Sequence, residues 1–188
     1  MKKTALITAD GFEEVEGLTV VDLLRRAGIV CDIVSLSGAG EITGSHGIRI
    51  AADRSFGETD FDDYDAVILP GGQPGTDTFL ADGRVKDLLR RFAAAGRLTA
   101  AVCAAPTVLA AAGLLEGKKA VCYPGLEGRL TGAEVLYEPA VQDGNVITGR
   151  SVGTAIPFAL QIICALEGKE AAESIRKKIV FPGLAAEE

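Results

Sequence analysis

The segment Leu98-Thr-Ala-Ala-Val-Cys-Ala-Ala-Pro-Thr-Val-Leu109 carries the strongest fold signal in the chain. Its first half is a continuous apolar run, which is typical of a parallel strand that is covered on both faces. Pro106 follows a short turn and suits the first turn of a helix, where its missing N–H needs no partner. The segment therefore predicts a buried strand, a sharp turn at Cys103 and the start of a helix.

Short apolar runs alternate with helical patterns on both sides of this segment. The most regular helix is predicted from Asp82 to Gly96, with apolar residues at helical spacing and a glycine at its end. This alternation predicts a flavodoxin-like, three-layer α/β/α sandwich with a mostly parallel sheet. We expect strands at 4–9, 29–36, 66–69, 98–103, 120–122 and 146–148, and further helices at 13–27, 154–166 and 169–179.

Two segments interrupt the alternation. Residues 41–53 contain glycines and alternating isoleucines, which favour a small hairpin beside the main sheet. Asp143-Gly144 is a typical hairpin turn and is expected to join 135–141 to 146–148. Because the sequence shows no repeat, linker or low-complexity tract, we expect a single domain spanning 1–188.

Composition restricts the possible partners. The chain has 188 residues, 48% hydrophobic and 24% charged, with a formal net charge of −7. Nucleic acids and anionic membranes select basic surfaces, so neither is expected as a partner. The first apolar run ends at Asp10 and is followed by glutamates, so we interpret it as a buried strand and not as a signal peptide. No run is long enough to span a membrane, and we expect a cytoplasmic protein.

The four cysteines, Cys31, Cys103, Cys122 and Cys164, are far apart and form no C-x-x-C pair. With His46 as the single histidine, neither a disulfide framework nor a zinc site is expected, and we predict no metal and no other cofactor.

Cys103 differs from the other cysteines because it lies at the predicted end of a strand, just before a helix N-terminus. Free N–H groups and the helix dipole favour a thiolate there, which predicts a pKa below the ordinary value of about 8.5. We therefore interpret Cys103 as a reactive thiolate. The alternative, a buried core cysteine, is our interpretation of the other three.

A second strand, 66–69, ends in Pro70-Gly71-Gly72. Glycines at this point allow close approach of the backbone, and their amides together with the N–H of Ala104 are candidate donors to an oxyanion. The alternative is an ordinary tight turn.

A carboxylate is expected from the start of the first helix, where Glu13, Glu14 and Glu16 occur together. Acidic residues are common in a first helical turn because they suit the dipole, so their presence alone proves no site. Glu16 lies at the margin of the apolar face, but the pattern leaves the choice among the three open.

Several motifs together carry a specific resemblance that covers nearly the whole chain. They are Ala9–Glu16, Asp22–Gly28, Asp65–Gly72, Ala101–Thr107, Thr148–Thr154 and Phe158-Ala-Leu160. The chain resembles the ThiJ/PfpI superfamily and, within it, the DJ-one subfamily. The resemblance implies a class I glutamine amidotransferase-like fold and a homodimer.

The resemblance also assigns roles to individual residues. Glu16 corresponds to a protonated carboxyl that donates a hydrogen bond to the thiolate of Cys103 and steadies a sulfinate after oxidation. Gly72 and Ala104 correspond to the oxyanion donors, with Gly71 adjacent.

Two positions depart from patterns within the superfamily, and a third, His46, matches one. Protease-like branches have histidine directly after the cysteine, whereas this chain has Ala104, so peptide hydrolysis is not expected. Many DJ-one relatives have a histidine across the pocket, where this chain has Tyr123, and a phenol is a poor base at neutral pH. His46 corresponds to a dimer-contact hairpin, as a residue that reaches the partner's pocket or as an exposed turn or interface residue.

The resemblance and the site together predict a cofactor-free enzyme of the glyoxalase III-like lyase or deglycase type with a stress-protective role. The expected substrate is a small reactive carbonyl, namely methylglyoxal, glyoxal or their adducts, and Cys103 is the expected nucleophile. The alternative is a non-enzymatic redox sensor or stress chaperone that is switched by oxidation of Cys103.

Overall fold

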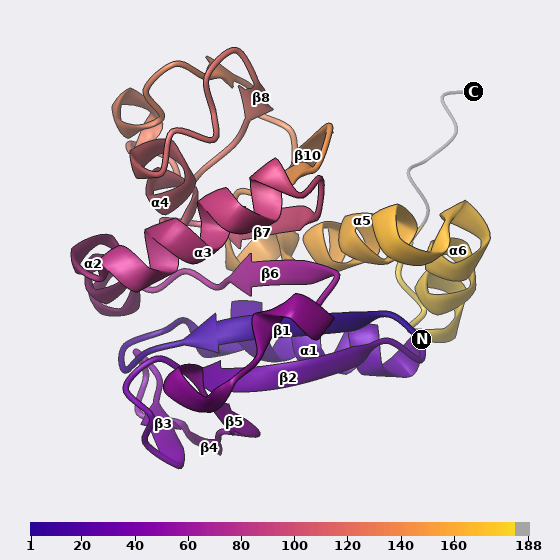
Figure 1. Ribbon diagram of the computed structural model, residues 1–188. Helices are drawn as coiled ribbons and strands as arrows, with labels where there is room; N and C mark the ends of the chain where they lie inside the picture. The colour runs from indigo at the N-terminus through magenta and orange to yellow at the C-terminus, as the bar shows by residue number, and fades with distance from the viewer. Residues whose placement is uncertain (183–188) are drawn as a thin grey trace.

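The computed structural model describes residues 1–182, so the last six residues of the predicted domain lie outside it. Its main sheet has seven strands in the order β10-β11-β7-β6-β1-β2-β5, and every strand except β10 is parallel to its neighbours (Figure 1). The strands are β1 (Lys3–Thr8), β2 (Val30–Ser35), β5 (Arg54–Ser55), β6 (Ala66–Leu69), β7 (Leu98–Val102), β10 (Ala140–Asp143) and β11 (Val146–Gly149).

Helices cover both faces of the sheet (Figure 1). Side chains alternate along each strand, so Leu6 packs into one core while its neighbours Ala5 and Ile7 pack into the other. The Leu6 side is covered by α1 (Glu14–Arg26), α5 (Ala155–Glu167) and α6 (Lys169–Lys178), and the opposite side by α2 (Gln73–Ala81), α3 (Gly83–Ala94) and α4 (Pro106–Ala111). The predicted three-layer α/β/α sandwich with a mostly parallel sheet is confirmed.

The expected hairpin at 41–53 forms as β3 (Glu41–Thr43) and β4 (Arg49–Ala51), which pair with each other outside the main sheet. Four short 3-10 turns complete the described chain: Phe56–Glu58, Phe61–Asp63, Glu127–Arg129 and Val152–Thr154.

Two predictions are wrong in detail. The expected strand at 120–122 is reduced to β8 (Lys119–Ala120), which pairs with β9 (Glu134–Val135) in a separate sheet. The N–H of Val121 instead donates to the hydroxyl of Thr148, so a side chain replaces the expected strand partner. The hairpin arm expected at 135–141 starts only at β10, because Val135 is already paired with β8.

The strand order places the carboxyl ends of β7, β6 and β1 side by side. From β1 the chain continues to β2 on one side, and it later returns to β6 on the other side. Loops that leave in opposite directions open a crevice at such a switch point, where ligands bind in open α/β sheets. Cys103, Gly71-Gly72 and the glutamates at the start of α1 all lie at this edge.

None of the helices within residues 1–182 combines the length and the apolarity needed to cross a bilayer.

The contact between β11 and α5 gives a test of the fold. A Cβ added to Gly149 would lie 2.9 Å from Cδ2 of Phe158, a side chain that is completely buried. We expect Gly149→Ala to destabilise the protein by about 1–3 kcal/mol, because α5 must move away from the sheet. Gly153→Ala, where the added carbon meets open space, is the control. Equal urea midpoints for the two variants would contradict this packing.

Candidate active site

Cys103 lies at the end of β7 in a left-handed backbone conformation, with φ of +65°. This region is uncommon for a residue other than glycine and costs conformational energy. Two hydrogen bonds hold the turn: the Cys103 N–H donates to the carbonyl of Gly149 at 3.0 Å, and its carbonyl accepts from the N–H of Tyr123 at 2.8 Å. The predicted sharp turn is therefore present, and its side chain is half-buried at the crevice.

Glu16 is completely buried in the first turn of α1. Its Oε2 accepts from the N–H of Gly71 at 2.9 Å, while its own N–H donates to the carboxylate of Glu13, which caps the helix. Within residues 1–182 its other oxygen, Oε1, has no hydrogen-bond partner. Of the three candidate glutamates, Glu16 is the one held beside Cys103.

Gly71 is required because the two side chains meet where its side chain would be. A Cβ at this position would lie 2.5 Å from Oε2 of Glu16 and 3.1 Å from Sγ of Cys103. The N–H of Gly71 donates to Glu16, so this amide already has an acceptor. Gly71 differs in this respect from the other predicted oxyanion donors. The N–H groups of Gly72 and Ala104 are the ones that donate toward the sulfur.

The electrostatic environment of Cys103 differs from the sequence-based prediction. Burial raises its pKa, the Glu16 carboxylate raises it further, and the amides of Gly72 and Ala104 lower it, with a net rise to about 12. The predicted lowering is therefore wrong. The prediction rested on a helix N-terminus alone, but α4 has only six residues. Burial of the thiol, together with the neighbouring carboxylate, outweighs the dipole of so short a helix.

The Glu16 carboxyl titrates near neutral pH. Burial raises its pKa, donation from Cys103 and Gly71 lowers it, and the charge of Glu13 raises it again, with a net value of about 7. The charge of Glu16 in turn opposes ionisation of Cys103, so Glu16 is the first of the two groups to ionise. A carboxyl in this range is suited to accept and return a proton at neutral pH.

Cys103 and Glu16 open into a cavity of about 440 Å³. Of the four predicted oxyanion and substrate residues, three line the cavity: Gly72, Ala104 and the half-exposed Tyr123. The fourth, Gly71, is not part of the cavity wall. Sequence reasoning missed further lining residues, including Ser45, Ser151 and Val152. The last two belong to the Thr148–Thr154 motif, whose Ser and Thr pattern gave the only sequence signal for them.

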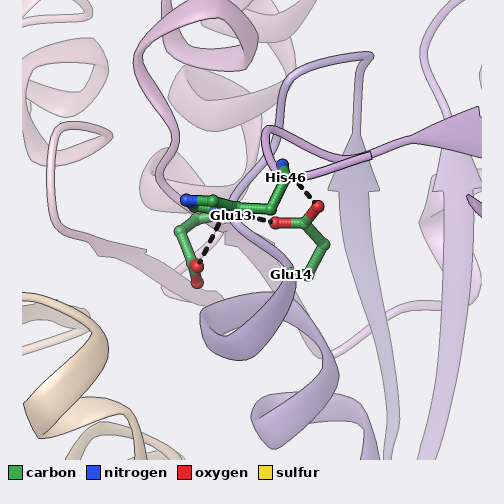
Figure 2. A group of neighbouring side chains, drawn as sticks. All are labelled: Glu13, Glu14 and His46. Carbon is green, nitrogen blue, oxygen red and sulfur yellow. Dashed lines mark hydrogen bonds and ion pairs between the residues drawn. The ribbon is translucent and has the colours of Figure 1, made fainter. Parts of the chain in front are cut away.

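His46 lines the same cavity of its own chain, from the turn between β3 and β4. Figure 2 shows its ring between Glu13 and Glu14. Its Nδ1 lies 3.0 Å from Oε2 of Glu14 and 3.8 Å from Oε1 of Glu13. The side chain is 73% exposed in the single chain, and its turn faces the site of the same chain. The two interpretations of its place in a dimer stay predictions.

Glu14 anchors this turn from the buried side. One oxygen accepts from the backbone N–H groups of His46 and Ile48, and the other from Nδ1 of His46 and the hydroxyl of Ser45. Burial raises its pKa, but these donors outweigh burial and lower the pKa to about 2. The pair lies 32 residues apart in sequence, so no local pattern could have revealed it.

The ligand atoms of Glu13, Glu14 and His46 lie within 4.8 Å of one another, a spacing that could hold a metal ion. However, both oxygens of Glu14 already accept hydrogen bonds, and Nδ1 of His46 is turned toward one of them. The donor set is thus arranged as an ion pair and not as an open coordination site.

The other cysteines lie outside the cavity. Cys31 and Cys122 are buried, Cys164 is half-buried on α5, and all four cysteines are free.

Together, the fold and the site define a flavodoxin-like α/β protein with a cysteine–glutamate pair at the switch point of its sheet. The family model described as the DJ-1/PfpI family matches residues 2–165. The chain belongs to the DJ-1/PfpI family, which confirms the resemblance inferred from its motifs.

Individual relatives match along their full length. Protein dj-1beta of Drosophila melanogaster is 40% identical over 183 residues, which cover 96% of this chain and 98% of that protein. Its crystal structure matches with a TM-score of 0.93 at 38% identity, over 97% of this chain and 99% of that one. The structure of oxidized Toxoplasma gondii DJ-1 matches with a TM-score of 0.93 at 30% identity, over 97% and 100% of the two chains.

The coupling of Cys103 to Glu16 predicts how the thiol responds to substitution. In Glu16→Gln the carboxylate no longer opposes ionisation, so the pKa of Cys103 should fall and its alkylation by iodoacetamide at pH 8 should become faster. Each unit by which the pKa falls raises the thiolate fraction about tenfold. Alkylation is measured by peptide mass spectrometry at Cys103 across a pH series.

Glu41→Gln, on the exposed face of the β3–β4 hairpin, is the control and should alkylate like the wild type. Slower alkylation of Glu16→Gln would show that a protonated Glu16 stabilises the thiolate, as the family resemblance implies.

Proposed function

We propose that this protein is a cofactor-free glyoxalase III-like lyase or deglycase that acts on methylglyoxal, glyoxal or their adducts. The observation that carries the proposal is the cysteine–glutamate pair: a thiol placed against a buried carboxyl whose pKa is about 7. The cavity of about 440 Å³ suits a small carbonyl compound, and two amides face the reacting sulfur.

In the first step, Sγ of Cys103 attacks the aldehyde carbon while the carboxylate of Glu16 takes the thiol proton. Removing this proton during attack overcomes the raised pKa of the thiol. The N–H groups of Gly72 and Ala104 stabilise the developing oxyanion, which then takes the proton from Glu16. The product of this step is a hemithioacetal on Cys103.

In the second step, Glu16 removes the proton from the former aldehyde carbon and delivers it to the neighbouring carbonyl carbon. One carbon is oxidised and the other reduced, so no external oxidant or reductant is needed. The resulting thioester is hydrolysed to a hydroxy acid, which is lactate for methylglyoxal. In deglycation Cys103 would attack the adduct carbon, the bond from that carbon to the amine or thiol would break, and the leaving group would take a proton and depart unmodified.

The position after the nucleophile is Ala104, so a cysteine–histidine pair built from adjacent residues is absent, and we do not propose a protease. We further propose that the protein acts as a homodimer in the cytoplasm with a stress-protective role. Its family membership and four free cysteines, which suit a reducing compartment, support this setting.

The proposal predicts that lactate formation from methylglyoxal depends on one cysteine. Cys103→Ala should lose turnover, because no other cysteine of the described residues lines the cavity. Cys164→Ala removes a half-buried cysteine elsewhere and should retain wild-type turnover. D-lactate is measured enzymatically, with free thiol as the reference. Wild-type rates in a folded Cys103→Ala variant would refute the proposal.

A second function, a redox sensor or stress chaperone switched by Cys103, is favoured by one separate observation. Oε1 of Glu16 is buried without a hydrogen-bond partner among the described residues, and the amides of Gly72 and Ala104 face the sulfur. These groups could hold the oxygens of a sulfinate, with Glu16 protonated as the donor. The matched Toxoplasma gondii structure is of an oxidized DJ-1, which supports this alternative.

Mild peroxide treatment followed by peptide mass spectrometry tests this second function. Cys103 should be oxidised to the sulfinate before the other three cysteines, and Glu16→Asp should change how far its oxidation proceeds, because the shorter side chain moves the donor away. Oxidation of all four cysteines at similar rates would exclude selective sensing.

A further inference from the structure

The chain has one histidine, and its ring lies on the wall of the cavity that holds Cys103. The mechanism above does not use it. The thioester intermediate requires a water molecule, and Glu16 is completely buried behind Cys103, whereas the imidazole of His46 is 73% exposed. His46 therefore combines access to solvent with access to the cavity.

The buried Glu14 determines which nitrogen of His46 carries the proton. With its pKa lowered to about 2, Glu14 is a carboxylate at neutral pH and can only accept hydrogen bonds. The 3.0 Å contact therefore requires a proton on Nδ1 of His46, which leaves the lone pair of the neutral ring on Nε2.

The titratable groups near the imidazole of His46 come from α1 and from the cavity wall. Glu13 and Glu14 face it from the start of α1, and the other titratable groups of the cavity are Glu16, Cys103 and Tyr123. Hydrogen bonding to Glu14 and the charges of Glu14 and Glu13 raise the pKa of His46 above its usual range. The neutral, base form of the imidazole is therefore reached at higher pH than in a free histidine.

We propose that His46 is the general base for hydrolysis of the thioester on Cys103, and that Glu14 is its positioning residue. This inference rests on the proposed function. Nε2 takes a proton from water as the water oxygen attacks the thioester carbonyl carbon. The carbon–sulfur bond then breaks, and the proton passes from His46 to the departing sulfur, which restores the thiol. The same transfer returns His46 to its neutral form, and the hydroxy acid then releases its own proton to solvent.

The hydrolytic role is tested with His46→Gln, which keeps a polar side chain but removes the base. With methylglyoxal, kcat for lactate formation should fall about a hundredfold, the lower range for loss of a general base. Single-turnover formation of the adduct on Cys103 should persist, so intact-protein mass spectrometry should show accumulation of a species with one added methylglyoxal. Arg49→Gln removes an exposed charge from the same hairpin and is the matched control.

The pH profile separates a base from a structural role. In the wild type kcat should rise with pH as His46 loses its proton, and this limb should vanish in His46→Gln. Glu14→Gln removes the partner that raises the pKa of His46, so the limb should move to lower pH.

Each result has a distinct meaning. The inference is supported if turnover depends on Cys103 and the His46→Gln variant is slow and accumulates the adduct. If turnover depends on Cys103 but His46→Gln hydrolyses the thioester at the wild-type rate, the inference is overturned and the proposed function stands. Turnover that does not depend on Cys103 overturns both the inference and the proposed function.

Discussion

The site depends on one buried carboxyl group. Glu16 has no exposed surface, and a single amide, that of Gly71, bridges it to the neighbouring strand end at 2.9 Å. Burial keeps its pKa near 7, and its charge raises the pKa of Cys103. The absence of a side chain at Gly71 follows from the same contact, because Glu16 and Cys103 occupy that space. The strained turn at Cys103 then brings the sulfur to this carboxyl.

The three glutamates at the start of α1 have different roles. Glu13 caps the helix, Glu14 anchors the β3–β4 turn, and Glu16 enters the site. All three are buried, which a preference for the helix dipole alone would not require. The backbone supports this arrangement, because Gly72 adopts φ of +88° and a Cβ there would collide with the carbonyl of Gly11. The loops after β1 and β6 are therefore packed directly against each other.

Local patterns predicted most of the sheet and the helices. The apolar run before Cys103 and the spacing between Asp82 and Gly96 gave β7 and α3, since burial on fixed faces imposes these periods. They failed for α2, whose start, Gly72-Gln-Pro-Gly75, has the composition of a turn although Pro74 suits a first helical turn. The short β8–β9 pair also escaped prediction, because two-residue strands have no period to detect.

The sequence by itself determined the fold class, the family and the candidate nucleophile, because hydrophobic periodicity and motif spacing are properties of neighbouring residues. Only the tertiary structure decided which glutamate faces Cys103, that the amide of Gly71 bonds to Glu16, and that His46 is held by Glu14 in the same cavity. The pKa of Cys103 is also decided by the tertiary structure. It depends on burial and on a charge from another strand's loop, and neither can be read from the residues beside it.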